Sequence, residues 1–230
     1  MSGRRLLIWR HGRTEWNAIG RMQGQSDVAL DETGVRQAHE AAPLLAAERP
    51  DAIFSSDLSR ARVTAEALGD LVRLPVKLDE RLRETCFGPW QGLTTEEIAA
   101  QFPDEYACWT SGKGFVVEGA EQPHQVSERM AAAIDDALEA SDGTLVVVTH
   151  GAAARRAVAG LLGWADDVVG KLGPLGNCRW SELRHTATGW RLHAHNAGPL
   201  AGAAGPHTPL AAADVEPPTA EYLTPAPTHR

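Results

Sequence analysis

Two short apolar segments of this chain each end on a histidine that is followed by glycine. Residues 6–9 (LLIW) lead into Arg10 and His11, and residues 144–149 (TLVVVT) lead into His150. Uninterrupted apolar or β-branched runs of this length are typical of strands that are buried on both faces of a parallel sheet. Open α/β sheets bind ligands at the carboxyl ends of their strands, so the pattern predicts that two imidazoles face one ligand there.

Helical patterns alternate with these strands. We expect a further buried strand at 52–54, helices over 31–48, 57–71, 122–140 and 151–162, and a hairpin formed by 178–185 and 190–195. Asp31 or Thr33 should cap the first helix, and Pro43 should kink or split it because proline removes a backbone donor. The alternation predicts an α/β fold of three layers, α/β/α, with a mostly parallel central sheet, and the hairpin predicts an antiparallel edge.

Composition indicates one folded domain followed by a tail. The chain has 230 residues, of which 43% are hydrophobic and 23% charged, and such a chain can bury its own core. We expect the domain to occupy residues 1–196. Residues 197–230 consist mostly of Ala, Gly, Pro and Thr, with few large apolar side chains to bury, so we expect a disordered tail there.

Charge and cysteine content exclude several classes of function. The net charge of −8 argues against a broad nucleic-acid surface, which needs clustered Lys and Arg. The three cysteines are widely spaced and form no CxxC pattern, so neither a disulfide framework nor a zinc site is expected. The apolar run at residues 6–9 is too short for a signal peptide or a membrane span. We therefore expect a cytosolic protein with no membrane partner.

The residues around the first histidine resemble a known motif. Residues 10–17 (RHGRTEWN), with 21–24 (RMQG), resemble the histidine phosphatase superfamily, which includes the cofactor-dependent phosphoglycerate mutases. The resemblance covers residues 4–196 and continues through 55–61 (SSDLSRA), 81–84 (RLRE), 88–93 (GPWQGL) and 149–151 (THG). It implies a phosphoryl transfer through a phosphohistidine, on a small phosphorylated metabolite, with no metal and no organic cofactor.

The resemblance also implies a role for individual residues. It makes His11 the nucleophile and Glu84 the general acid, it places Arg10, Arg60 and His150 around the phosphate, and it places Asn17 and Gln23 at the pocket edge. Guanidinium groups suit this reaction because they bind phosphate oxygens through two donors at once. A histidine attacks only through an unprotonated nitrogen, a form that neighbouring arginines favour. Glu84 must be protonated to assist a poor leaving group.

Some assignments stay open at this point. Spacing alone does not decide which histidine is phosphorylated, because both follow strands. Arg13 is undecided, and Glu15 is left outside the site, because exposed loop charges are usually solvated. Trp90 lies beside the acid loop and is the one tryptophan that we expect could touch substrate; the others are expected to pack in the core or at an edge. A homodimer is compatible with the sequence.

Three functions compete. Phosphoglycerate mutases of this superfamily carry a tyrosine and a lysine after the acid, whereas residues 85–95 here (TCFGPWQGLTT) contain neither, which favours hydrolysis. Residues 21–25, 55–58 and 81–85 are similar to those of actinobacterial glucosyl-3-phosphoglycerate phosphatases, although residues 118–124 depart from the family pattern near the expected substrate mouth. A non-catalytic phosphoester-binding protein would be expected to lack a catalytic residue, and all are present.

Overall fold

A single six-stranded sheet forms the centre of the molecule. The computed structural model describes residues 4–111 and 117–199. The strands are β1 (Arg5–Arg10), β2 (Ala52–Ser55), β3 (Val76–Leu78), β4 (Thr144–Thr149), β5 (Trp180–Thr186) and β6 (Gly189–Ala197). They lie in the order β3-β2-β4-β1-β5-β6; the first four run parallel, and β5 and β6 form an antiparallel edge. The predicted fold class, including the hairpin edge, is confirmed.

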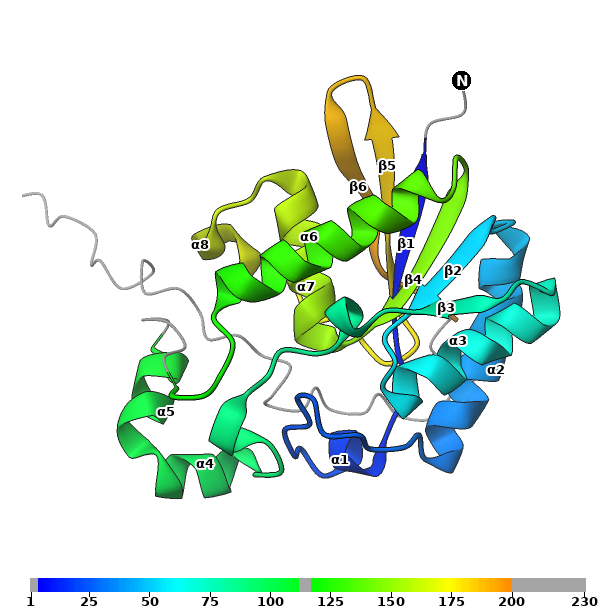
Figure 1. Ribbon diagram of the computed structural model, residues 1–230. Coiled ribbons are helices and arrows are strands. Elements are labelled where there is room, and N and C mark those ends of the chain that lie inside the picture. The colour runs from blue at the N-terminus through cyan, green and yellow to red at the C-terminus, as the bar shows by residue number, and fades with distance from the viewer. Residues whose placement is uncertain (1–3, 112–116, 200–230) are drawn as a thin grey trace, which may run out of the picture.

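Helices cover both faces of this sheet. They are α1 (Glu15–Ala18), α2 (Glu32–Ala47), α3 (Ser59–Val72), α4 (Thr95–Gln101), α5 (Pro103–Thr110), α6 (Pro123–Glu139), α7 (Gly151–Leu162) and α8 (Asp166–Val169), with 3-10 turns η1 (Glu80–Leu82) and η2 (Gly88–Trp90). Figure 1 shows α6 and α7 in front of the sheet and α2 and α3 on its other side. No helix of the described residues is both long enough and apolar enough to span a membrane.

Strand β1 is apolar from Leu6 to Trp9 because both of its faces are covered. Leu6 and Ile8 belong to the core on the α6 and α7 face, while Leu7 and Trp9 belong to the core on the α2 and α3 face. All four side chains are fully buried. Because successive strand residues point to opposite faces, a strand covered on both sides must be apolar at every position. Each such side chain contributes about 1.5–3 kcal/mol to folding by leaving water.

The helix α2 has the predicted cap but is not split at Pro43. It is one continuous helix capped by the Asp31 side chain, and Pro43 lies inside it without splitting it. Pro43 is exposed, and the carbonyl that loses its partner there belongs to His39, which is also exposed. Water can replace the missing bond on this face, so the proline is tolerated. The predicted disordered tail falls almost entirely on residues 200–230, which lie outside the described residues, and β6 extends to Ala197, one residue past the expected domain end.

A small third core lies at the carboxyl edge of the sheet, where Figure 1 shows α1, α4 and α5. It contains Met22, Trp90, Ile98, Trp109 and Val117. The Trp90 ring is fully buried, and it meets Trp109 edge-on with 5.7 Å between ring centroids. The Trp90 ring thus packs in this core, and the expectation that it could touch substrate stays a prediction. Sequence reasoning missed this group of short helices and predicted only the elements that cover the sheet.

Candidate active site

The ends of β1 and β4 bring the two histidines together. The strands pair in parallel register, with Arg10 opposite Thr149, and the His11 N–H donates to the Thr149 carbonyl at 3.0 Å. The His11 and His150 rings lie 5.1 Å apart between centroids. Their residues are only 2% and 0% exposed. The sheet thus holds two imidazoles side by side at its carboxyl edge, as the strand pattern predicts.

Glycine is required immediately after His11. A Cβ atom on Gly12 would lie 2.4 Å from the carbonyl oxygen of Gly34, at the start of α2. The Gly12 N–H donates to Thr64 Oγ1 at 3.0 Å, and that hydroxyl in turn donates to the Arg60 carbonyl. The loop that carries His11 is therefore packed against α2 and tied to α3, because only glycine allows so close an approach.

The hydrogen bonds of His11 define its tautomer. Nδ1 lies 2.6 Å from the Gly12 carbonyl oxygen. A carbonyl can only accept, so Nδ1 carries the proton and the lone pair of the neutral ring lies on Nε2. Within residues 4–111 and 117–199, no hydrogen bond involves that Nε2 atom. His11 therefore presents a free nitrogen lone pair.

His150 has the opposite arrangement. Arg60 Nε donates to His150 Nδ1 at 3.2 Å, and His150 Nε2 lies 2.9 Å from Ser56 Oγ. Because the guanidinium can only donate, Nδ1 must hold the lone pair and Nε2 the proton. The lone pair of His150 is thus occupied by Arg60, and its N–H is directed to the Ser56 hydroxyl.

Burial and nearby arginines keep both rings neutral. Burial, followed by the charges of Arg60 and Arg10, holds the pKa of His11 well below its ordinary value. Burial, then Arg60 and His11, lower the pKa of His150 in the same direction. Burial lowers the pKa of Arg60 to about 10, which still leaves its guanidinium charged at neutral pH. The site therefore combines two neutral imidazoles with a buried positive charge.

The two arginines are fixed by backbone carbonyls. Arg60 is fully buried and donates to the carbonyls of Gly24 and Ser26, both at 2.7 Å. Arg10 donates to the Leu175 carbonyl at 2.6 Å. Neutral carbonyls orient the Arg60 guanidinium without cancelling its charge, so this residue suits an anionic ligand such as phosphate.

Glu84 reaches the site from the segment that follows η1. Its Oε1 accepts from the N–H groups of Thr85 and Ala153, each at 2.8 Å, and its Oε2 accepts from the Ala152 N–H at 3.1 Å. Two of these donors belong to the first turn of α7, the helix that begins directly after His150. A helix N-terminus attracts a carboxylate. Glu84 is therefore held at the same end of α7 as His150.

Asn17 and Gln23 are both buried. Asn17 Oδ1 accepts from the Thr14 N–H at 3.2 Å, the Thr14 hydroxyl at 3.1 Å and Asn177 Nδ2 at 3.3 Å, which leaves its Nδ2 as the end that can meet a ligand. Gln23 Oε1 is buried and has no partner among the described residues. A buried amide with an unmet hydrogen bond at this edge is suited to a ligand that supplies one.

Arginines at the rim are paired with carboxylates. Arg13 pairs with Asp31 at 2.7 Å and Arg21 with Glu97 at 3.0 Å, and Arg83 pairs with Asp57. Glu15 is exposed in the first turn of α1. Arg13, which the sequence left undecided, thus has a structural partner.

Sequence reasoning missed several residues that contact the site. Ser56 contacts His150, Thr64 ties down the His11 loop, and Asn177 donates to the His11 carbonyl at 3.1 Å. Ser56 could have been found, because it follows the buried strand β2 at the same sheet edge as both histidines. Asn177 lies in an irregular segment before β5 and carries no such signal.

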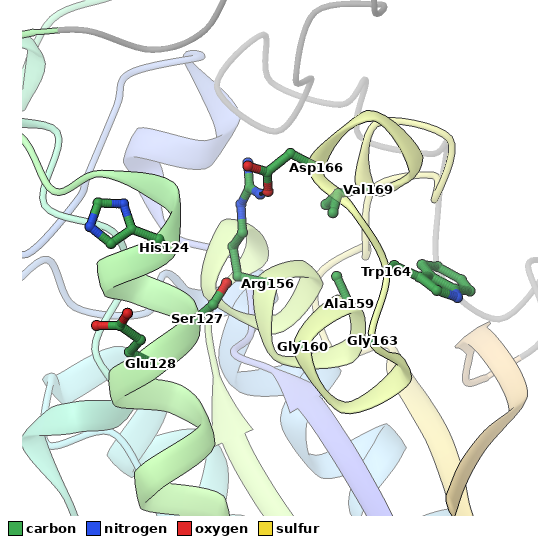
Figure 2. A pocket seen from close by; sticks show the side chains of 10 residues that line it. All are labelled: His124, Ser127, Glu128, Arg156, Ala159, Gly160, Gly163, Trp164, Asp166 and Val169. Atoms are coloured by element: carbon green, nitrogen blue, oxygen red, sulfur yellow. Dashed lines mark hydrogen bonds and ion pairs between the residues drawn. The ribbon is translucent and has the colours of Figure 1, made fainter.

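A second cavity lies elsewhere, between α6, α7 and α8 (Figure 2). It has a volume of about 400 Å³, and its lining includes His124, Glu128, Arg156 and Trp164. Arg156 forms an ion pair with Asp166 at 2.7 Å. None of its lining residues belongs to the two-histidine cluster, and its mixed charges indicate no ligand class.

Comparisons with known proteins agree with this geometry. The profile of the histidine phosphatase superfamily (branch 1) matches residues 6–198. A glucosyl-3-phosphoglycerate phosphatase of Mycolicibacterium vanbaalenii is 40% identical over 216 residues, which span 86% of this chain and 96% of that protein. Phosphoserine phosphatase 1 of Hydrogenobacter thermophilus is 32% identical over 161 residues, 69% of this chain and 76% of that protein.

Solved structures give the same result. A mycobacterial glucosyl-3-phosphoglycerate phosphatase in complex with VO3 has a TM-score of 0.80 at 36% identity and covers 85% of this chain and 100% of its own. A phosphoserine phosphatase mutant from Entamoeba histolytica, in complex with phosphoserine, has a TM-score of 0.74 at 30% identity and covers 84% of this chain and 96% of its own. This chain belongs to branch 1 of the histidine phosphatase superfamily and is a phosphatase of that superfamily.

Proposed function

We propose that this phosphatase hydrolyses a small phosphomonoester through a phosphohistidine formed on Nε2 of His11. The observation that carries the proposal is the difference between the two tautomers. His11 bonds through Nδ1 to the Gly12 carbonyl and keeps its Nε2 lone pair, whereas the lone pair of His150 is used by Arg60. Only a nitrogen with a lone pair can attack phosphorus, so the geometry favours His11 as nucleophile.

The remaining groups serve the transferred phosphoryl group. Arg10 and Arg60 would neutralise its oxygens, and His150 would donate its Nε2 proton to one of them by exchanging the Ser56 hydroxyl for a phosphate oxygen. Attack by His11 forms the N–P bond and breaks the P–O bond to the alcohol. Water then attacks phosphorus, breaks the N–P bond and restores the neutral imidazole.

Glu84 is the proposed acid in the first step and base in the second. In the structure its carboxylate accepts three N–H groups, and an ionised carboxylate makes all of these bonds. As the acid, Glu84 would carry the transferred proton on Oε2, which accepts one bond only. It gives this proton to the departing alkoxide and later takes one from the attacking water.

A sugar phosphate related to glucosyl-3-phosphoglycerate is the proposed substrate. Relatives at 37–40% identity are glucosyl-3-phosphoglycerate phosphatases, and the motifs at 21–25 and 81–85 resemble that group. The unmet amide of Gln23 is suited to a substrate hydroxyl. A phosphoserine-like substrate is the competing choice, since other relatives act on phosphoserine.

Phosphoglycerate mutase activity is the alternative reaction. A Yersinia pestis protein named as a probable phosphoglycerate mutase is 37% identical over 191 residues. A mutase must bind further anionic groups of a bisphosphorylated intermediate, yet residues 85–95 contain neither tyrosine nor lysine, and the rim residues Arg13, Arg21 and Arg83 already pair with carboxylates. These features favour water as the phosphoryl acceptor.

A substrate panel tests the proposal. We expect purified protein to release phosphate from glucosyl-3-phosphoglycerate with a higher kcat/KM than from phosphoserine or 3-phosphoglycerate. A parallel assay should interconvert 3- and 2-phosphoglycerate, with 2,3-bisphosphoglycerate added, more slowly than phosphate is released. Faster interconversion would establish the mutase instead, and binding without turnover of any phosphomonoester would establish a non-catalytic protein.

A further inference from the structure

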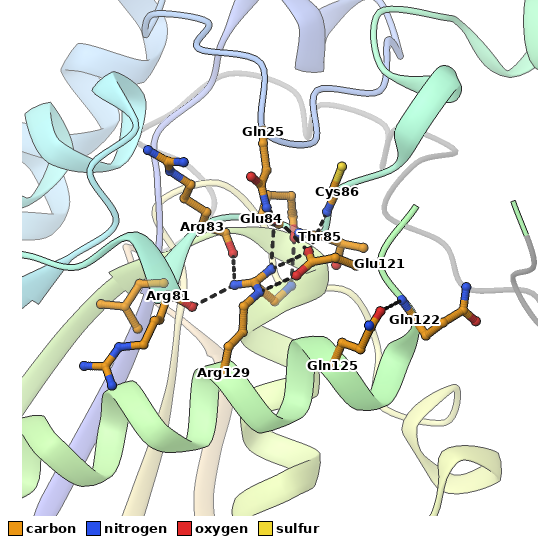
Figure 3. A network of polar contacts seen from close by, with 12 residues as sticks. Gln25, Arg81, Arg83, Glu84, Thr85, Cys86, Glu121, Gln122, Gln125 and Arg129 are labelled. Carbon is orange, nitrogen blue, oxygen red and sulfur yellow. Dashed lines mark hydrogen bonds and ion pairs between the residues drawn. The ribbon is translucent and has the colours of Figure 1, made fainter. Parts of the chain in front are cut away.

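The segment that carries Glu84 is irregular, and a single arginine binds much of its backbone. Arg129, on α6, donates from Nη1 to the carbonyls of Arg81 and Arg83 at 2.7 and 2.6 Å, and from Nη2 to the Glu84 carbonyl at 2.9 Å. Figure 3 shows the guanidinium between α6 and this segment. A backbone outside helix and sheet must find such partners when it is buried. Arg129 therefore fixes the path of the chain on both sides of residue 83.

Glu121 completes the contact from the other end of the segment. It forms two bonds with Arg129, Nε to Oε1 at 2.7 Å and Nη2 to Oε2 at 2.8 Å. Its Oε2 accepts from the Cys86 N–H at 2.7 Å, and its own N–H donates to the Cys86 carbonyl at 2.8 Å. Although burial acts to raise it, the bonds to Arg129 and Cys86 hold the pKa of Glu121 below its ordinary value. The Arg129–Glu121 ion pair thus hydrogen-bonds to the backbone at both ends of residues 81–86.

Two further contacts anchor the same segment. The Leu82 carbonyl accepts from Thr149 Oγ1 at 2.7 Å, next to His150, and Gln25 Nε2 donates to the Glu84 carbonyl at 3.2 Å. Four consecutive carbonyls, 81 to 84, are thereby bound by side chains. The Glu84 carboxylate itself is placed against α7, so the residue is fixed from two helices.

We propose that Arg129 and Glu121 are positioning residues that set the location of the Glu84 carboxyl group relative to the leaving oxygen. This inference rests on the acid role proposed for Glu84. Among the described residues, neither side chain hydrogen-bonds to a histidine or to the carboxyl group of Glu84; both contact the backbone of residues 81–86, and the charge of Arg129 also contributes to the lowered pKa of His150. The stretch 118–124 therefore supplies a carboxylate, that of Glu121, which orders the acid segment.

A comparison of leaving groups tests this proposal. Arg129→Gln and Glu121→Gln should each slow phosphoenzyme formation from glycerol 3-phosphate, measured by rapid quench, on the order of ten-fold or more, because small displacements of a catalytic group are costly. Both variants should leave the rate of phosphoenzyme formation from p-nitrophenyl phosphate nearly unchanged, because its leaving group hardly needs a proton. Glu121→Gln keeps the size of the side chain but removes the charge that orients Arg129, so it carries the test if Arg129→Gln does not fold.

Two further variants separate positioning from general stability. Arg62→Gln removes a surface arginine paired with Glu66 at 3.1 Å. This control should leave the rates with both substrates unchanged. In the Glu84→Gln background, adding Arg129→Gln should cause little further loss on glycerol 3-phosphate, because the acid is already gone. Equal losses on both substrates, or additive losses in the double variant, would overturn the positioning role. If Glu84→Gln itself fails to discriminate between the substrates, the proposed acid is wrong.

Discussion

His11 and His150 occupy equivalent positions at the ends of neighbouring parallel strands, yet they differ in what their nitrogens do. Both are buried, and both have a lowered pKa for the same main reason, loss of water. His11 turns Nδ1 to its own backbone, whereas His150 receives Arg60 on Nδ1 and contacts Ser56 through Nε2. The difference teaches that burial keeps both rings neutral, while hydrogen bonds decide which ring keeps a free Nε2 lone pair and which carries its proton on Nε2.

The largest effect should come from removing each ring in turn. His11→Ala should reduce turnover on the order of ten-thousand-fold or more and abolish the phosphoenzyme, because the nucleophile is lost. His150→Ala should cost on the order of a hundred- to a thousand-fold, the usual effect of losing one donor to a transition state, and should still form phosphoenzyme. Rapid-quench assays measure both quantities. A phosphoenzyme that survives in His11→Ala and vanishes in His150→Ala would reverse the comparison.

Acid should destabilise the fold through both rings. An unfolded histidine takes up a proton below about pH 6.5, whereas the folded rings, with their lowered pKa values, do not. Stability should therefore fall as the pH drops below that value, by about 1.4 kcal/mol per unit for each ring, until the folded-state pKa is reached. Above about pH 6.5 neither ring makes the stability depend on pH.

Urea unfolding at several pH values checks this effect. His11→Gln and His150→Gln should each reduce the slope between pH 6.5 and 5 by a similar amount. A slope that is unchanged in either variant would show that the ring is protonated in the folded protein, against the tautomer assigned to it.

A smaller effect should distinguish the two hydroxyls near α3. Ser56→Ala removes the partner of His150 Nε2 in the free enzyme; because a phosphate oxygen replaces this bond in the proposed reaction, losing about 1 kcal/mol there should speed phosphoenzyme formation by at most roughly five-fold. Ser59→Ala, which removes an exposed contact to Asp27 at 2.7 Å, is the matched control and should have no effect. Equal rates in the two variants would mean that Ser56 does not orient His150.

Removing metal ions with a chelator should have no effect on turnover. In the proposed reaction Arg10, Arg60 and His150 meet the charge on phosphate, and the described part of the chain gathers no cluster of three or more metal-ligating side chains. Turnover in excess EDTA should equal turnover in its absence. Loss of activity with EDTA, followed by recovery with Mg²⁺, would show that a metal meets the phosphate.

The parts of the site that sequence could predict are those with a periodic signal. The runs that end at His11 and His150 have the pattern of strands buried on both faces, and parallel strands end at one edge, so the two rings could be expected near one another; their direct pairing depends on the strand order. The interior of the sheet follows for the same reason. Arg60 and Glu84, in contrast, came from resemblance to a family and carry no signal in spacing.

Other features depend on contacts that no local pattern encodes. The tautomer of His150 depends on Arg60, which is 90 residues away in sequence. Arg129 is one of several polar residues on α6, and only the folded structure shows that it binds the segment around Glu84. Trp90 was expected near substrate because it follows the acid in sequence, but packing against Trp109 takes it into a core.

Locating the phosphate on the trapped enzyme tests the central claim most directly. Protein quenched in alkali during turnover preserves phosphohistidine, and fragmentation and NMR then identify the residue and the nitrogen that carry phosphorus. We predict a single acid-labile phosphate on Nε2 of His11, the nitrogen that the Gly12 carbonyl leaves free. Phosphate on His150, on Nδ1 of His11, or on a serine such as Ser56 would contradict the assignment of nucleophile and donor.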